Sequence, residues 1–288
     1  MNNNDQLSIH RISAFSLNNE GGNPAGVAIG EQHPTVADMQ AIAADVGYSE
    51  TAFLAPVAGS GIDKHWKVRY FSPEIEVPFC GHATIASGRA LAESCGEGLY
   101  TLSLNHGDIT LNIDKAESGE WEITLQSTPV DMASPDIAMV NDAAALFGFS
   151  PDKLDNELEP GFGGAGTRHL IFVVKDKATL QQMKYDFEPV KALMLAHDLT
   201  TISIVWKESD SVYHARNAFA SGGVYEDPAT GAAAAALAGY LRNHVKKDGE
   251  FTIVQGVDMG SPSRLNVRFS ADDKVGVWVS GETRMITE

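Results

Sequence analysis

Three residues of this sequence have side chains suited to proton transfer and stand at the borders of predicted elements: Glu50, His82 and Asp227. Glu50 lies just before a strand-like segment, between Ser49 and Thr51. Burial and neighbouring groups can tune a carboxylate or an imidazole to exchange protons near neutral pH. A glutamate at the start of a strand is also commonly a solvated surface residue, so its position alone does not select the catalytic interpretation.

Cys80 and His82 flank Gly81 at the predicted start of a helix. A helix N-terminus carries backbone N–H groups without helical partners and the positive end of the helix dipole, so it attracts anions such as carboxylates. His82 is expected to form hydrogen bonds there, and Cys80 has the option of acting as a thiolate. The alternative is a glycine- and alanine-rich packing helix with a water-exposed histidine.

The stretch that contains these residues, 79–86, returns in altered form as 229–236. One ungapped offset of 150 residues aligns Gly81 with Gly231, Glu76 with Glu226, Pro78 with Pro228 and Cys80 with Thr230. Residues 231–241 are apolar almost all round, which is typical of a buried helix. The repeat therefore predicts two buried helices, each entered through a turn that carries a glutamate and a proline.

Short apolar and alternating runs predict many strands around these two helices. The strand-like segments are residues 10–15, 27–29, 66–71, 100–104, 109–113, 121–125, 168–174, 202–206, 212–219, 251–254, 265–269 and 275–279. A further, amphipathic helix is expected to begin at Thr35 and to stop at Gly47. The glycine-rich segments 20–26 and 161–166 are expected to be loops near a ligand, and residues 127–136 the domain boundary.

Composition limits the classes of partner and the number of domains. A chain of 288 residues with 43% apolar and 20% charged residues is expected to form two globular domains. A net charge of −17 argues against nucleic acid and anionic membranes as partners. Residues 1–6 are polar and precede no apolar run, and the two cysteines suit a reducing compartment, so a cytoplasmic location is expected.

Several familiar cofactor signatures are missing or out of context. Residues 161–166 match the letters of the dinucleotide fingerprint, but a strand is predicted after them rather than before them, so we expect no nucleotide there. The nine histidines show no metal-ligand spacing, and neither a GxSxG elbow nor a P-loop is present. We therefore expect no metal and no cofactor, and proton transfer by side chains is the leading chemistry.

Four motifs in order resemble the phenazine-biosynthesis PhzF-like isomerases over close to the full length. They are residues 22–26 (GNPAG), 49–53 (SETAF), 79–84 (FCGHAT) and 226–231 (EDPATG), with Gln255-Gly256 and Met259-Gly260 following. The resemblance implies an α+β fold similar to diaminopimelate epimerase. That fold has two pseudo-symmetric domains, each a strongly curved, mostly antiparallel sheet wrapped around a central helix, with the active site in the cleft between them.

Carried over position by position, the resemblance assigns Glu50 as the general acid/base, with His82 and Asp227 as polar catalytic residues. The substrate-binding positions that it implies are Asn23, Pro24, Ser49, Cys80, Gly81, Ala83, Thr230, Gly231 and Ala232. In diaminopimelate epimerase two cysteines stand where this chain has Cys80 and Thr230, so thiol racemisation by two bases is disfavoured. Ala232 stands where the family commonly has serine, and Ser261 where it commonly has arginine, so the resemblance leaves open whether the phenazine precursor is the substrate.

These observations predict a cofactor-independent isomerase of a small carboxylate-bearing metabolite. The first domain is expected over residues 1–127, and the second over residues 128–274. The last strand, about 275–288, has the option of packing back onto the first domain, and a homodimer is an option for assembly. Two alternatives stay open: a Cys80-dependent racemase or dehydratase on the same fold, and a non-catalytic metabolite-binding protein.

Overall fold

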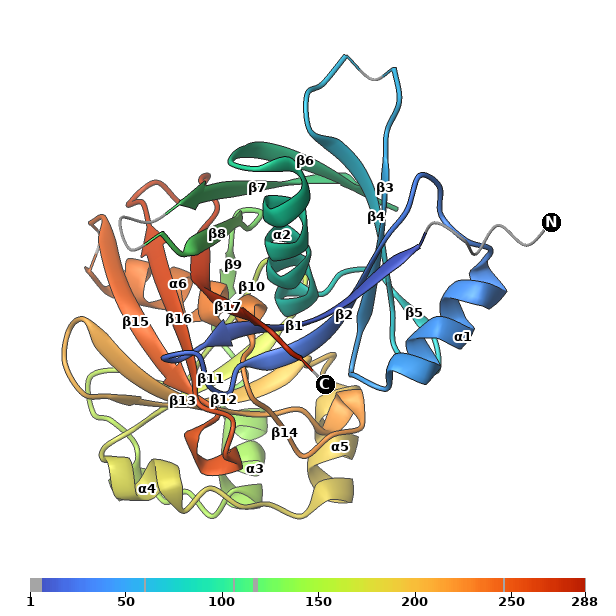
Figure 1. Ribbon diagram of the computed structural model, residues 1–288. Helices are drawn as coiled ribbons and strands as arrows, with labels where there is room; N and C mark the ends of the chain where they lie inside the picture. Colours follow the sequence, from blue (N-terminus) through green and yellow to red (C-terminus); the bar gives the residue numbers. More distant parts are fainter. Residues whose placement is uncertain (1–6, 60, 106, 116–118, 246, 288) are drawn as a thin grey trace. The chain divides into compact units, whose positions relative to one another are not determined.

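The computed structural model describes residues 7–59, 61–105, 107–115, 119–245 and 247–287 (Figure 1). The polar N-terminal residues 1–6, used above for the prediction of location, lie outside the described residues. The chain divides into two compact units, residues 1–126 with 280–288 and residues 127–279. The sequence places these boundaries at 127/128 and 274/275.

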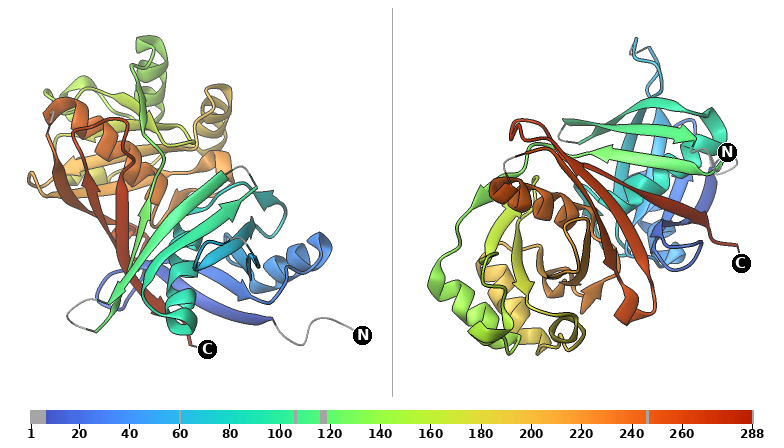
Figure 2. Two further views of the ribbon diagram at one scale, coloured as in Figure 1. Left: turned by 90° about the horizontal axis from the view of Figure 1, so that it is seen from above. Right: turned by 90° about the vertical axis from the view of Figure 1, so that its left-hand side faces the viewer.

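In the first unit, eight strands among the described residues pair into a closed sheet in the order β17-β1-β2-β3-β4-β6-β7-β8, with β8 returning to β17. The strands are β1 (Ser8–Ser16), β2 (Asn23–Ile29), β3 (Thr51–Pro56), β4 (His65–Phe71), β6 (Gly98–Leu104), β7 (Gly107–Lys115), β8 (Trp121–Gln126) and β17 (Trp278–Met285). They surround helix α2 (Gly81–Cys95), as Figures 1 and 2 show. The short strand β5 (Glu76–Val77) pairs with β4 and leads into this helix.

Helix α2 fits inside the sheet because its residues are small. A Cβ added at Gly88 would lie 2.4 Å from Cγ2 of Ile123 on β8, so only glycine allows this approach. The hydroxyl groups of Tyr70 and Thr84 satisfy each other at 2.6 Å in the buried interior, and burial raises the pKa of Tyr70. The helix ends at Cys95, which is exposed.

Helix α1 (Val36–Val46) forms where local signals predicted it. The Thr35 hydroxyl accepts the backbone N–H of Asp38 at 3.2 Å, and Gly47 closes the helix in the left-handed conformation with φ 73°. Met39 and Ala43 turn toward the sheet and pack with Phe53.

The prediction of a loop over residues 20–26 is wrong from Asn23 onward. Residues Asn23–Ile29 form β2, which pairs antiparallel with β1 from the contact of Asn23 with Ala14. Gly22 makes the preceding turn at φ 81°, where a Cβ would lie 2.5 Å from Oγ of Ser13. Pro24 is tolerated because the pairing of β2 with β3 begins only at Gly26, beyond the proline.

The second unit pairs its strands in the order β9-β10-β11-β12-β13-β15-β16. The strands are β9 (Asp131–Ala133), β10 (Gly161–Gly164), β11 (His169–Val174), β12 (Thr201–Lys207), β13 (Val212–Ala218), β14 (Glu226–Asp227), β15 (Gly249–Gln255) and β16 (Ser263–Phe269). The helical elements are α3 (Ile137–Leu146), α4 (Lys177–Gln181), α5 (Phe187–Ala196), α6 (Gly231–Val245) and the short turns η2 (Pro151–Lys153), η3 (Ala220–Gly222) and η4 (Val257–Met259). Among the described helices, none combines the length and the apolar content that crossing a bilayer requires.

The two units share one order of elements, as the repeat predicts. Helices α2 and α6 each run for 15 residues and each follow a two-residue strand, β5 or β14. In the first unit β4 pairs parallel with β6, the strand after α2, and in the second β13 pairs parallel with β15, the strand after α6. The curved-sheet α+β fold predicted from the repeat and the resemblance is therefore confirmed.

The prediction of a loop over the glycine-rich segment 161–166 is also wrong, because its first four residues form strand β10. A Cβ at Gly161 would lie 2.8 Å from the Tyr240 ring, and one at Gly163 would lie 2.9 Å from the carbonyl oxygen of Ala236. The glycines thus allow β10 to lie against α6. The expected linker 127–136 likewise contains β9, and the last predicted strand begins at Trp278 rather than residue 275.

Candidate active site

The side chains of Glu50 and His82 are in direct contact in the first unit. Oε2 of Glu50 lies 3.3 Å from Nε2 of His82, and their side chains are only 17% and 7% exposed. Glu50 immediately precedes β3, and its backbone carbonyl accepts the N–H of Gly26 on β2 at 3.1 Å. The sheet therefore fixes the backbone of the carboxylate while the first turn of α2 fixes the imidazole.

Three more of the predicted residues surround the His82 ring. Nδ2 of Asn23 lies 3.3 Å from Nδ1, and Sγ of Cys80 lies 3.3 Å from the same nitrogen. Oγ of the exposed Ser49 lies 3.4 Å from Nε2. We call the group Asn23, Ser49, Glu50, Cys80 and His82 the His82 cluster; it joins β2, the start of β3 and the start of α2.

The contacts of His82 define its hydrogen-bonding pattern. With the Asn23 amide nitrogen as donor, Nδ1 of His82 is an acceptor, because an amide NH₂ group has no lone pair to offer. The ring proton of a neutral His82 then resides on Nε2 and points to the Glu50 carboxylate. The imidazole can thus hold Glu50 in place while one carboxylate oxygen stays available to a ligand.

The start of α2 brings backbone donors close to this cluster. Cys80 is the N-cap residue in an extended conformation, and its side chain makes no capping hydrogen bond. Gly81, His82 and Ala83 form the first turn, in which backbone N–H groups have no helical acceptor. The arrangement suits a small anion, because the helix dipole is positive at this end.

The predicted residues of the second unit form a separate cluster around Thr230. Its hydroxyl donates to Oδ2 of Asp227 at 2.5 Å, and Nε2 of Gln255 donates to the Asp227 carbonyl oxygen at 2.7 Å. Gln255 also contacts Oγ1 of Thr230 at 3.2 Å and accepts its backbone N–H at 3.4 Å. Gly231 is buried and Ala232 partly buried in the first turn of α6 that follows, while Pro24 lies on β2 in the first unit.

Gln255 belongs to this group of contacting residues, although the sequence analysis assigned it no role. It is 2% exposed at the end of β15, and its amide holds both ends of the turn between Asp227 and Thr230. The only available signal was its place in the Gln255-Gly256 motif. Gly256 has φ 74°, and a Cβ there would lie 2.2 Å from the carbonyl oxygen of Ser261. The polar Ser261 thus sits where the backbone is tightly packed.

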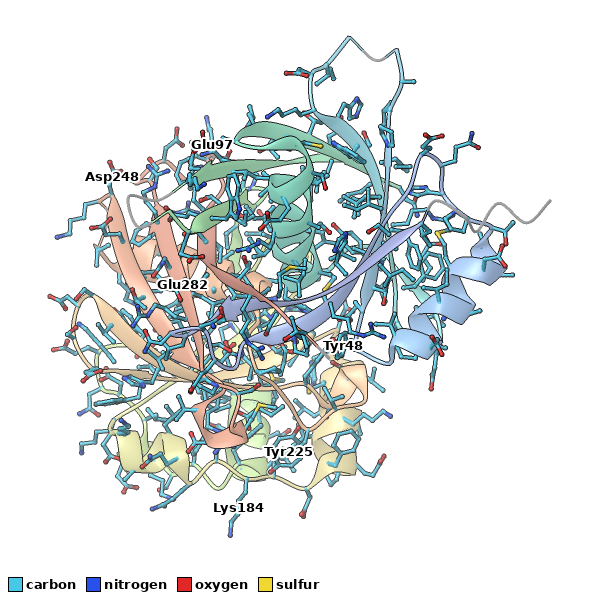
Figure 3. All side chains as sticks on the ribbon, in the orientation of Figure 1. Tyr48, Glu97, Lys184, Tyr225, Asp248 and Glu282 are labelled. Atoms are coloured by element: carbon cyan, nitrogen blue, oxygen red, sulfur yellow. The ribbon has the colours of Figure 1, made fainter. Side chains whose placement is uncertain are left out.

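Each unit anchors the turn before its central helix with an arginine and a glutamate. Arg216 pairs with the buried Glu226 through two contacts of 3.0 and 2.6 Å, and it also donates to the Gln181 carbonyl oxygen. Tyr225, labelled in Figure 3, stacks on Tyr185 beside this pair with ring centroids 4.1 Å apart. In the first unit the equivalent pair is Arg69 on β4 and Glu76 on β5, with contacts of 2.8 and 2.6 Å.

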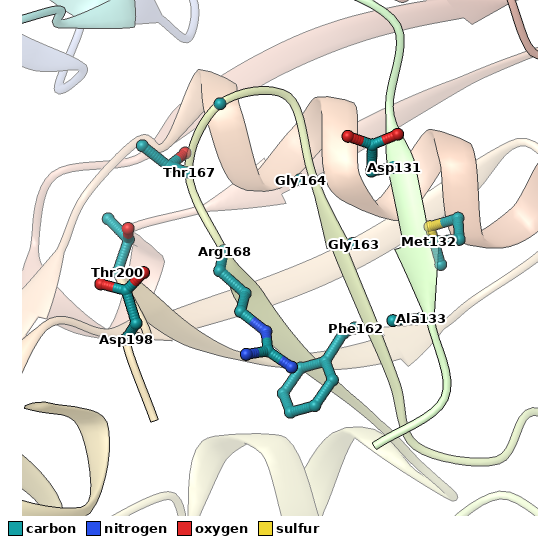
Figure 4. A pocket seen from close by; sticks show the side chains of 11 residues that line it. Asp131, Met132, Ala133, Phe162, Gly163, Gly164, Thr167, Arg168, Asp198 and Thr200 are labelled. Atoms are coloured by element: carbon teal, nitrogen blue, oxygen red, sulfur yellow. The ribbon is translucent and has the colours of Figure 1, made fainter. Parts of the chain in front are cut away.

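A cavity of about 460 Å³ lies in the second unit (Figure 4). Asp227, Thr230 and Gln255 are not among the residues that line it. It is lined in part by Asp131, Thr167, Asp198 and Arg168, whose guanidinium group stacks over the Phe162 ring at 4.0 Å. None of the predicted site residues lines it. The cation that lines it, Arg168, already rests on an aromatic ring, so the cavity is a weaker candidate for carboxylate chemistry than the His82 cluster.

Comparison with known proteins identifies the family. A family model described as "Phenazine biosynthesis-like protein" matches residues 12–288. The chain belongs to this phenazine biosynthesis-like family. An uncharacterized isomerase of Mesorhizobium japonicum is 29% identical over 273 residues, covering 89% of this chain and 88% of the relative. The uncharacterized isomerase YfhB of Bacillus subtilis is 26% identical over 302 residues, and the alignment covers 98% of this chain and 99% of YfhB.

Solved structures of the phenazine biosynthesis-like family share the fold. The Bacillus anthracis phenazine biosynthesis protein of the PhzF family aligns with a TM-score of 0.85 and 25% identity, over 98% of this chain and 97% of that one. A hydroxyproline epimerase from Agrobacterium vitis aligns with a TM-score of 0.65 at 13% identity, over 100% of this chain and 92% of that one. The latter likeness concerns the fold alone.

Proposed function

We propose that this chain is an isomerase that moves a proton on a small carboxylate-bearing metabolite, with Glu50 as the acid/base. The observation that carries the proposal is the His82 cluster, in which a largely buried carboxylate is held 3.3 Å from an imidazole beside a helix N-terminus. A fixed carboxylate that is both hydrogen-bonded and open on one side can accept a proton from a carbon acid and return it. Relatives named isomerases support the reaction class.

We further propose that one base, Glu50, both removes the proton from the substrate and returns it. Thr230 stands where the offset of the repeat matches Cys80, and its hydroxyl is already engaged as a donor to Asp227 at 2.5 Å. A neutral hydroxyl with that role is a poor base compared with a thiolate or a carboxylate. The proton that Glu50 removes is therefore returned by Glu50 at another atom of the substrate, which is an isomerisation rather than a two-base racemisation.

The third step concerns the substrate carboxylate. The His82 cluster contains no lysine or arginine, and the chain carries a net charge of −17. Backbone N–H groups of Gly81, His82 and Ala83 are then the donors that favour an anion. We propose that they bind the substrate carboxylate.

The test is proton exchange rather than growth or a named product. Small carboxylic acids with an acidic C–H bond are incubated with the protein in deuterated water, and mass spectrometry detects the incorporation of deuterium. Once an exchanging compound is found, Glu50→Gln should reduce the exchange by about 10²–10⁴-fold, because the amide cannot carry the proton. Glu93→Gln, at an i,i+4 surface pair with Arg89, is the matched control and should exchange like wild type.

A second candidate is a Cys80-dependent racemase or dehydratase, favoured by the 3.3 Å contact between Sγ of Cys80 and Nδ1 of His82. In that case Cys80→Ser abolishes exchange whereas Glu50→Gln retains a substantial part of it. Binding of the acid without any exchange would instead support a non-catalytic metabolite-binding protein. Wild-type exchange in Glu50→Gln would refute the assignment of Glu50.

A further inference from the structure

The fold brings together three metal-ligand side chains that the sequence keeps apart. A carboxylate oxygen of Glu50, Sγ of Cys80 and a ring nitrogen of His82 all lie within 4.8 Å of one another. They come from the residue before β3 and from the first turn of α2, so no ligand spacing along the chain reveals them. We propose that this triad binds a thiophilic divalent cation such as Zn²⁺, and that the bound cation blocks the acid/base.

Two of the three ligand atoms already lie at the separation that a tetrahedral zinc site requires. With zinc bonds of ordinary length, a nitrogen and a carboxylate oxygen lie about 3.4 Å apart, and a nitrogen and a sulfur about 3.6 Å. Nε2 of His82 lies 3.3 Å from Oε2 of Glu50 and 3.8 Å from Sγ of Cys80. Nε2 of His82 and the Glu50 oxygen are therefore already at coordination distance. Sγ of Cys80 lies closer to Nδ1, at 3.3 Å, so the Cys80 side chain must rotate to bring its sulfur to a cation held at Nε2.

The surroundings of the triad suit a bound cation. Cys80 and His82 are 8% and 6% exposed, so their donor atoms face the interior rather than bulk water. Metal-bound histidines commonly donate their second ring N–H to a carbonyl oxygen. Asn23 lies 3.3 Å from Nδ1 of His82, and turning over its amide presents the oxygen to that N–H.

The donor set also defines which cations fit. A thiolate and an imidazole favour Zn²⁺, Co²⁺ and Cu ions, whereas Mg²⁺ and Ca²⁺ require oxygen ligands. Three protein ligands leave the fourth tetrahedral position to water or to a ligand carboxylate. The inhibitory part rests on the proposed function, since a cation held by Glu50 prevents that carboxylate from taking a proton; the binding part does not.

Cobalt titration of the whole protein without any substrate tests the binding. Co²⁺ bound to a thiolate gives a ligand-to-metal charge-transfer band in the near ultraviolet, and Zn²⁺ should displace it. The band should appear in wild type and in Cys95→Ser, which removes the exposed cysteine at the far end of α2. It should be absent in Cys80→Ser, provided circular dichroism shows that this variant is folded.

Two further variants test the other ligands. Loss of an outer hydrogen-bond partner already lowers metal affinity by about 10–100-fold, so Glu50→Gln and His82→Gln should each weaken cobalt binding at least that much. A wild-type protein without the band, a band that follows Cys95, or full affinity in both variants overturns the proposal. Failure of the isomerase assignment would show in the deuterium exchange of Glu50→Gln and would leave the cobalt titration unchanged.

Discussion

The buried His169 should make the second unit sensitive to mild acid. Its side chain is completely buried, with Nδ1 2.7 Å from Oγ1 of Thr201 and Nε2 2.9 Å from Oγ1 of Thr167. Burial lowers the pKa of His169 from 6.5 to about 4, because the charged form is desolvated. As the pH falls below 6.5, the unfolded chain takes up the proton before the folded chain does.

The sign and size of the effect follow from this difference. The contribution of His169 to the free energy of unfolding is fully present above the unfolded pKa and declines as the pH falls toward the folded one. Linkage gives a loss of about 2 kcal/mol by pH 5, and a limit of about 3 kcal/mol below pH 4.

Urea unfolding at pH 7 and pH 5, followed by circular dichroism, measures this loss. In His169→Gln the amide can still bond the neighbouring threonines but does not titrate, so the difference in unfolding free energy between the two pH values should shrink by about 2 kcal/mol. His197→Gln, at an exposed position after α5, is the control and should behave like wild type. An equal pH dependence in wild type and His169→Gln would refute the argument.

Two further predictions concern the turns and the packing of the central helices. Arg216→Met leaves the carboxylate of Glu226, whose side chain is 3% exposed, without its partner and should cost about 3–5 kcal/mol of unfolding free energy. The equivalent Arg69→Met breaks the pair with Glu76, whose two side chains are 20% and 28% exposed, and should cost at most about 1 kcal/mol of unfolding free energy. Similar losses in both variants would contradict the role of burial. Gly163→Ala places a Cβ 2.9 Å from the Ala236 carbonyl oxygen and should lower stability by about 1–3 kcal/mol in urea unfolding; a stability equal to that of wild type would show that α6 can move away from β10.

Much of the fold is determined by patterns that act locally or repeat along the chain. The offset of 150 residues located both central helices, because a helix-compatible run that is apolar almost all round is buried in a protein core. The start and end of α1 followed from Thr35 and Gly47, whose effects on the backbone need no distant partner. The resemblance then supplied the arrangement of strands that periodicity alone left open.

The glycine-rich strands show where local reasoning fails. Glycine is the default residue of turns, so residues 23–26 and 161–164 were predicted to be loops. Gly163 is required instead because β10 lies against the carbonyl oxygen of Ala236, more than 70 positions along the chain. Only the packed structure distinguishes a glycine that bends the backbone from one that lets two elements approach.

The site divides in the same way. The sequence by itself selected Glu50, His82 and Cys80 as reactive side chains, because their chemistry and their places beside a strand and a helix start can be recognised locally. It could not show that their ligand atoms lie within 4.8 Å of one another, or that Nδ2 of Asn23 lies 3.3 Å from Nδ1 of His82. Those facts depend on how β2, β3 and α2 meet, and long-range packing decides that.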